Sequence, residues 1–224
     1  MKILALDTST EYCSLALWLD GNVLCKEVLA GQKHTELLLP MLQEMLAESG
    51  LALTQLDGFA FGAGPGSFTG LRIACGIVQG LAFATDLPVI GISTLEAMAQ
   101  RIGASHVMAA LDARMGEIYY AAYTQTADGW SIIQAPILCL PQHIPQLPGG
   151  RCWVGCGSGF DQYHELLSYL YSNSLYRIEP GCYPHAQEIA RLAAPKLLKG
   201  LGIAPEEAAP VYIRNKVALK ENER

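Results

Sequence analysis

The chain has 224 residues, of which 51% are hydrophobic and 16% are charged, and its formal net charge is -6. A disordered chain would be polar and highly charged, so this composition excludes disorder and provides ample apolar surface for a core. The negative charge excludes a global basic field that would attract nucleic acid, although a local basic patch is still compatible with it. The longest uncharged, turn-free stretch near the middle, 73–85, is shorter than the ~20 residues that span a bilayer, and Asp7 interrupts the apolar N-terminus. We therefore expect a cytoplasmic protein without membrane contact.

Short strands alternate with helices in the first half of the chain. The hydrophobic pattern predicts strands over 3–6, 14–19, 23–29, 59–61 and 89–92, with a hairpin turn at Asp20-Gly21-Asn22. It predicts helices over 34–49, 69–85 and 94–101, the first of which is stopped by Gly50.

The pattern restarts in the second half. Strands are predicted over 106–112 and 117–124, and Asp128-Gly129 turns into a third strand. Four prolines crowd the stretch 135–150, helices are predicted over 160–171 and 185–198, and a short strand with a polar helical tail is predicted over 211–224. No Ser-rich or charged linker separates the halves, so they are expected to share an interface.

The two halves resemble each other. We superpose Leu6-Asp7 on Leu111-Asp112, Leu15-Ala16-Leu17 on Tyr120-Ala121-Ala122, and Asp20-Gly21 on Asp128-Gly129. This internal duplication predicts an α/β protein with two similar lobes, 1–104 and 105–224, the terminal tail of the second returning to the first. The alternative is that any two β-meanders look alike.

A glycine-rich loop, 62–70, follows a strand and opens a helix, which is a context for binding an anion with backbone N–H groups. It is not a P-loop, because it contains no Lys, and it is not the dinucleotide fingerprint, because Ser67 stands where the third Gly should be. The alternative is an ordinary turn in which Ser67 or Thr69 caps the helix. No nucleotide site is therefore predicted, and the weak candidate residues are Asp7, Ser9, Gly64 and Gly66.

Two aspartates and two cysteines are candidate metal ligands. Asp7 ends the first strand and could hold a metal through water, with Asp112 as its companion. The alternative is that both aspartates end their strands with Asx turns. Cys152 and Cys156 are spaced as C-x3-C, but His164 is the nearest further ligand and has no partner at ligand spacing. We interpret both cysteines as buried structural thiols.

Four segments closely resemble the bacterial TsaB family, and the resemblance extends over the whole chain. They are ILALDTST at 3–10, FAFGAGPGSFTGLR at 59–72, ISTLEA at 92–97 and PVYIRN at 210–215. The resemblance implies an actin/Hsp70/sugar-kinase type of fold with two duplicated lobes, the second of them reduced. It also implies the role of a non-catalytic partner of TsaD, in forming threonylcarbamoyladenosine at position 37 of tRNAs that read codons beginning with A.

The catalytic relative TsaD carries a metal-binding H-x-x-x-H in the matching segment. Here Thr94 and Met98 stand at the two ligand positions, and a hydroxyl and a thioether cannot replace two imidazoles for a divalent ion. The resemblance therefore implies no catalytic residue, no metal and no cofactor. The second lobe is also too short for the adenosine-binding insertions of the nucleotide-using relatives.

Two helices carry more apolar residues than one sheet-facing stripe requires. Beyond Arg72, the helix 69–85 has no charge, and its Gly76 and Gly80 would let another helix approach closely. The alternative is a well-buried internal helix. The predicted partner interface consists of Leu38, Met41, Leu42, Met45, Arg72, Ile73, Ile77 and Leu81, with Met41 and Met45 as the pair expected to face the partner.

The resemblance implies a heterodimer with TsaD, an ATPase partner TsaE, a homodimer when the protein is alone, and at most indirect contact with tRNA. The alternative is an enzyme of the same fold class, a small-molecule kinase, an acyl transferase or a metallopeptidase. Titration of ATP and Zn²⁺ into the purified chain distinguishes the two hypotheses, because only the enzyme should bind either tightly.

Overall fold

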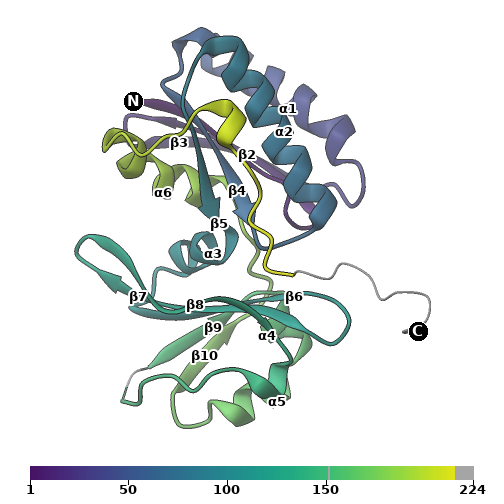
Figure 1. Cartoon of the computed structure of the whole chain (residues 1–224), viewed down its shortest axis with the longest axis vertical. Helices are drawn as coiled ribbons and strands as arrows, with labels where there is room; N and C mark the ends of the chain where they lie inside the picture. The colour runs from purple at the N-terminus through teal and green to yellow at the C-terminus, as the bar shows by residue number, and fades with distance from the viewer. Residues whose placement is uncertain (151, 215–224) are drawn as a thin grey trace.

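The computed structural model describes residues 1–150 and 152–214 and contains two five-stranded sheets (Figure 1). The strands of the first sheet are β1 (Lys2–Asp7), β2 (Tyr12–Leu19), β3 (Asn22–Leu29), β4 (Gly58–Gly64) and β5 (Val89–Ser93). Their order in the sheet is β3-β2-β1-β4-β5. β1 pairs antiparallel with β2 and parallel with β4, so the sheet is mixed.

The second sheet repeats this arrangement. Its strands are β6 (His106–Asp112), β7 (Ile118–Thr126), β8 (Gly129–Cys139), β9 (Trp153–Cys156) and β10 (Leu175–Glu179). They lie in the order β10-β9-β6-β7-β8, and β6 pairs antiparallel with β7 and parallel with β9. Read from its own first strand, this is the order of the first sheet. The predicted α/β fold with two duplicated lobes is therefore confirmed.

Helices cover both faces of the first sheet. The helices are α1 (His34–Ser49), α2 (Phe68–Thr85), α3 (Thr94–Ile102), α4 (Ser158–Gln162), α5 (His164–Leu170) and α6 (Ala186–Leu198), with short 3-10 turns η1 (Leu53–Gln55), η2 (Pro141–His143) and η3 (Pro205–Glu207). In Figure 1, α1 and α2 lie side by side on one face of the first sheet and α6 lies on the other. α3 lies between the two sheets. We call the first sheet with α1, α2 and α6 the first lobe, and the second sheet with α4 and α5 the second lobe.

The alternation of side chains along β1 explains this layering. Leu4 and Leu6 join the core formed with α1 and α2, whereas Ile3 and Ala5 join the core formed with α6. Successive side chains of a strand point to opposite faces, so a strand covered on both faces is apolar at every position. α6 comes late in the sequence but packs on the first sheet, where its buried alanines allow a close approach.

Most predicted elements of the first lobe are present at nearly the predicted bounds. α1 spans the predicted residues and ends at Gly50, whose φ of +66° is the left-handed conformation that glycine adopts at helix ends. The predicted superposition of the halves is off by one residue in the second strand. Leu6 pairs with Leu15 and Leu111 pairs with Tyr119, because the connection between the first two strands is one residue shorter in the second lobe.

The second half departs further from prediction. The helix predicted over 160–171 is two short helices that break at Tyr163, and β9 and β10 were not predicted. Val211 begins no strand, and residues 215–224 of the predicted tail lie outside the described residues. Cys156 is buried as predicted, in the same core cluster as Cys182, but Cys152 is exposed, so its interpretation as a buried thiol was wrong.

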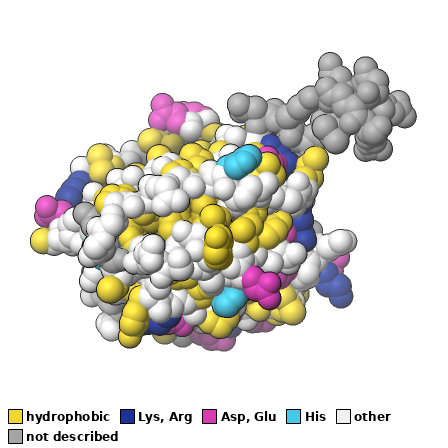
Figure 2. Space-filling model, turned by 90° about the horizontal axis from the view of Figure 1, so that it is seen from below, with side chains coloured by type: hydrophobic (Ala, Val, Ile, Leu, Met, Phe, Trp, Pro, Cys, Tyr) yellow, Lys and Arg dark blue, Asp and Glu magenta, His cyan; other side chains and the backbone are white. Residues whose placement is uncertain are grey.

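Within the described residues, α2 alone has the length and mean hydropathy, 1.3, of a membrane span. A core helix passes the same test, and Ala74, Cys75 and Val78 of α2 are buried in the core against the first sheet. Figure 2 shows the molecule from the side of the second lobe. Hydrophobic side chains on this face lie among uncharged ones, and its charged side chains are few and lie mainly near the margins.

Candidate functional site

The first candidate site is the turn after β1. Asp7 is 1% exposed, and its Oδ1 accepts hydrogen bonds from the backbone N–H and the hydroxyl of Ser9, at 3.1 and 2.8 Å. Its Oδ2 is buried and has no partner among the described residues. Burial raises the pKa of the Asp7 carboxyl from 3.8 to about 6, because the charged form loses its hydration, while the two bonds from Ser9 oppose the shift. The predicted Asx turn is present.

The glycine-rich loop packs directly on this turn. A Cβ at Gly62 would lie 1.9 Å from Asp7 Oδ2, and one at Gly66 would lie 2.7 Å from the carbonyl oxygen of Ser9. The backbone N–H of Ser67 donates to Ser9 O at 2.7 Å, and that of Gly70 donates to the Ser67 hydroxyl at 3.3 Å. These loop N–H groups, which could have faced a phosphate, are therefore committed to protein oxygens.

Asp112 occupies the equivalent place in the second lobe, again in an Asx turn. Its Oδ1 accepts from the backbone N–H of Arg114 at 3.0 Å, and its Oδ2 lies 3.4 Å from the Arg114 guanidinium. Thr94 and Met98, the two residues that the family resemblance aligned with metal ligands, are both fully buried. The Thr94 hydroxyl donates to Pro65 O at 2.5 Å, and Met98 packs in the core between α3 and the second sheet. Both positions therefore serve packing.

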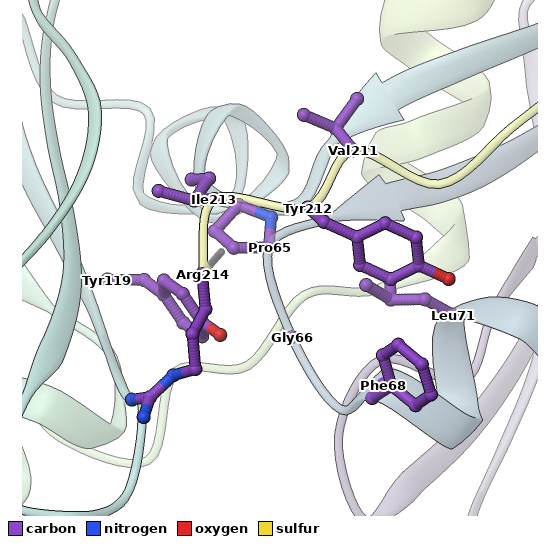
Figure 3. Close-up of a pocket in the computed structure, with 9 residues that line it drawn as sticks. All are labelled: Pro65, Gly66, Phe68, Leu71, Tyr119, Val211, Tyr212, Ile213 and Arg214. Atoms are coloured by element: carbon purple, nitrogen blue, oxygen red, sulfur yellow. The ribbon is translucent and has the colours of Figure 1, made fainter. Parts of the chain in front are cut away.

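A cavity of about 270 Å³ lies between the lobes beside Gly64. Its lining consists of Ala63, Gly64, Pro65, Gly91, Ser93, Pro136, Val211 and Ile213. The lining is mostly apolar, and Val211 and Ile213 come from the C-terminal segment, which Figure 3 shows passing over Pro65. In residues 1–150 and 152–214, no group of three or more His, Cys, Asp or Glu side chains is arranged to hold a metal ion.

The second candidate site is the outer surface of α2. One face of α2 is buried, and the opposite face is open: a Cβ added at Gly76 or Gly80 would meet no atom within 4 Å. Arg72 is exposed beside this glycine face, and Phe83 is 79% exposed. Ile73, Ile77 and Leu81 are half-buried along its flanks. α2 is therefore covered on one face only, and the prediction that a partner covers the other face stays a prediction.

The structure corrects the predicted role of α1. Leu38, Leu42 and Met45 are 0%, 3% and 1% exposed and belong to the core of the first lobe, so they cannot contact a partner in this conformation. Their spacing forms the stripe that meets the sheet. Met41 is half-buried on the flank of that stripe, so the expected pair of Met41 and Met45 is split between surface and core.

Two curated relatives match this chain over nearly its whole length. The tRNA threonylcarbamoyladenosine biosynthesis protein TsaB of Escherichia coli is 42% identical, with 99% of this chain and 98% of the relative covered. The protein of the same name from Haemophilus influenzae is 40% identical over 99% and 97%. The chain belongs to the TsaB family. It therefore takes part in the biosynthesis of threonylcarbamoyladenosine in tRNA.

A broader family model and two solved structures agree with the TsaB assignment. The model described as TsaD, tRNA N6-adenosine threonylcarbamoyltransferase, matches residues 28–220. YeaZ from Pseudomonas aeruginosa is 39% identical, with a TM-score of 0.88 over 94% of this chain and 99% of that one. A further Pseudomonas aeruginosa structure, described as uncharacterized and similar to the peptidase YEAZ, is 38% identical with a TM-score of 0.89 over 95% and 99%.

Proposed function

We propose that this chain is a non-catalytic scaffold that pairs with a TsaD-type catalytic subunit during formation of threonylcarbamoyladenosine. The open glycine face of α2 is the observation that carries the proposal. Without side chains at Gly76 and Gly80, a second helix can approach the backbone of α2 closely, and Ile73 and Ile77 would line the contact. An apolar helix face on the surface of a protein with few charged residues marks an interaction site.

The turn after β1 supports the non-catalytic half of the proposal. Asp7 is 1% exposed and is enclosed by Ser9 and Gly62. Thr94 and Met98 are committed to packing, so neither presents a ligand atom to a metal. A protein with these positions filled contributes to the reaction through the subunits it holds.

The further parts of the proposal follow from the TsaB resemblance. The partners are TsaD in a heterodimer and the ATPase TsaE, the protein forms a homodimer when alone, and its contact with tRNA is at most indirect. We propose a cytoplasmic protein whose two domains are residues 1–104 and 105–224. α6 of the second range packs on the first sheet, so the two domains share the core of the first lobe.

Glycine substitutions separate binding from folding. We expect Gly76→Leu and Gly80→Leu to weaken association with the catalytic subunit by at least about a hundredfold, because a leucine side chain would hold the partner helix away from the α2 backbone. The lone variants should be slightly more stable than the wild type, since glycine is the weaker helix former by up to about 1 kcal/mol. Affinity is measured by calorimetry and stability by urea denaturation.

The test is decisive because affinity is expected to fall while the stability of the lone chain is expected to rise. A variant that loses both stability and affinity would indicate damage to the fold, and wild-type affinity in both variants would refute the α2 interface. As a second variant, Ile77→Glu places a charge on the half-buried flank of α2 and should also abolish pairing. Ile132→Glu is the matched control, because Ile132 is 59% exposed on β8 in the other lobe.

The alternative function, an enzyme of the same fold class, has the cavity between the lobes as its one structural support. Titration of ATP and of Zn²⁺ into the lone chain tests it. On the scaffold proposal, neither gives a stoichiometric binding isotherm. A tight one-to-one isotherm for either compound would favour the enzyme.

A further inference from the structure

The C-terminal segment Ala208–Arg214 runs from the first lobe to the second. It follows η3, passes the N-terminal end of α2 and the Gly64-Pro65 turn, and ends against the loop between β6 and β7 (Figure 1, Figure 3). We call this segment the strap. It forms no strand or helix, so its position is set by specific contacts along its length.

Hydrogen bonds hold the first half of the strap to the first lobe. The Gln79 side chain of α2 donates to the carbonyl oxygen of Ala208 at 2.9 Å. The backbone N–H of Val211 donates to Ala63 O, at the end of β4, at 2.7 Å. The approach is close, because a Cβ at Gly64 would lie 2.8 Å from the carbonyl oxygen of Val211.

An aromatic and arginine cluster joins the middle of the strap to α2. Arg72 Nε donates to the Tyr212 hydroxyl at 2.8 Å, and the Arg72 guanidinium lies 3.8 Å from the centre of the Phe68 ring. The rings of Phe68 and Tyr212 are 5.2 Å apart (Figure 3). Stacking of this kind fixes the orientation of a guanidinium. Tyr212 therefore connects the strap to the same end of α2 that presents Arg72 at the surface.

The last residue of the strap, Arg214, is anchored in the second lobe. Its Nη2 lies 2.8 Å from Glu117 Oε2 and donates to Ala113 O at 2.8 Å. These two acceptors flank a loop in which Arg114 and Met115 both have positive φ, 63° and 57°, a conformation that costs energy for residues with a side chain. Arg214 thus binds both ends of a strained loop, and its side chain is only 14% exposed.

We propose that Ala208–Arg214 is a conformational strap that fixes the orientation of one lobe relative to the other, with Arg214 as its latch, and that a partner bound on α2 is coupled to the second lobe through Arg72 and Tyr212. The strap itself depends only on the contacts above. The coupling to a partner rests on the proposed function of α2.

Hydrogen exchange of the full chain tests the latch. In Arg214→Ala, the amides of Val211, Ala113 and Glu117 should exchange at least about tenfold faster than in the wild type, because each is bonded in the strap or in the loop that Arg214 closes. Glu117→Gln, which removes only the charge, should give a smaller increase at the same amides. Arg177→Ala is the control, since it breaks an ion pair with Glu179 elsewhere in the second lobe.

Unchanged exchange at these three amides in Arg214→Ala would overturn the strap. The coupling is tested by adding the catalytic subunit to the wild-type chain and to Tyr212→Phe, which lacks only the hydroxyl that Arg72 contacts. Both should bind, and binding should slow exchange at Ala113 in the wild type but not in the variant. A complex that leaves Ala113 unchanged in the wild type would overturn the coupling. Failure to form a complex would contradict the proposed function, and exchange in the lone chain would still decide the strap.

Discussion

Replacement of Asp7 by Asn should change how stability depends on pH. The Asp7 carboxyl is buried, one of its oxygens has no partner in the described part of the chain, and burial raises its pKa from 3.8 to about 6. The folded protein therefore binds a proton at Asp7 more tightly than the unfolded chain does. The stability that this proton contributes is fully present below pH 3.8 and is lost as the pH rises through about 6.

The size of the change in stability follows from the rise in the Asp7 pKa. A rise of about two pKa units corresponds to ~3 kcal/mol of unfolding free energy, at about 1.4 kcal/mol per unit. Because Asn does not titrate, the stability of Asp7→Asn relative to the wild type should increase by ~3 kcal/mol between pH values below 3.8 and well above 6. The difference in unfolding free energy between the two proteins has a part that is the same at every pH, which reflects the different hydrogen bonding of the amide. Only the part that changes with pH reports the titration of the Asp7 carboxyl.

Urea denaturation of both proteins across this pH range measures the difference directly, and the contributions of other titrating groups cancel. Parallel stability curves would refute the reasoning. Ser9→Ala gives a second test by the same measurement, because the two hydrogen bonds from Ser9 lower the pKa of Asp7. Without the hydroxyl, the loss of stability should move to higher pH.

Two further predictions concern the same region. Gly70→Ala should destabilise the fold by about 3 kcal/mol or more, because its Cβ would lie 1.8 Å from the backbone oxygen of Thr8. Gly76→Ala in the same helix should stabilise the fold slightly, because its Cβ would meet no atom within 4 Å and alanine is the better helix former. Thermal denaturation of the pair checks the contrast. Asp7→Ala and Asp112→Ala should leave tRNA threonylcarbamoylation by the reconstituted proteins within a few-fold of wild type. A loss of several orders of magnitude in a folded variant would place chemistry in this chain.

The fold could be predicted where the signals were local. A strand ending in Asp and a tight turn occur in both halves, which was enough to identify the duplication. β9 was missed because it has four residues, of which one is glycine and one cysteine, and β10 because its alternation is weak. Tyr163, at the break between α4 and α5, packs against the core of the second lobe, and no local pattern in the sequence marks this break.

On α2 the predicted interface residues are exposed or half-buried, so the interface there stays a prediction, whereas three of the four residues predicted on α1 are buried in the core. On α1, Leu38, Leu42 and Met45 form one apolar stripe, and Leu37 and Met41 form a second beside it. The sequence shows the surplus of apolar residues but not which stripe meets the sheet. The contact of Arg72 with Tyr212 joins residues that are 140 positions apart, so the strap could not be predicted from local spacing.

Close backbone contacts explain several glycines of the loop 62–70, and the same kind of contact explains glycines of the segment Gly155–Gly159 in the second lobe. A Cβ at Gly70 would lie 1.8 Å from the backbone oxygen of Thr8, which directly follows the first strand of the first lobe. In the second lobe, a Cβ at Gly157, just after β9, would lie 2.2 Å from the carbonyl oxygen of Ala110 in β6. In both lobes the chain that leaves the fourth strand must cross closely over the end of the first strand, and only glycine leaves room for that crossing. The duplicated topology therefore accounts for Gly62, Gly66 and Gly70, which contact Asp7, Ser9 and Thr8, without a bound phosphate.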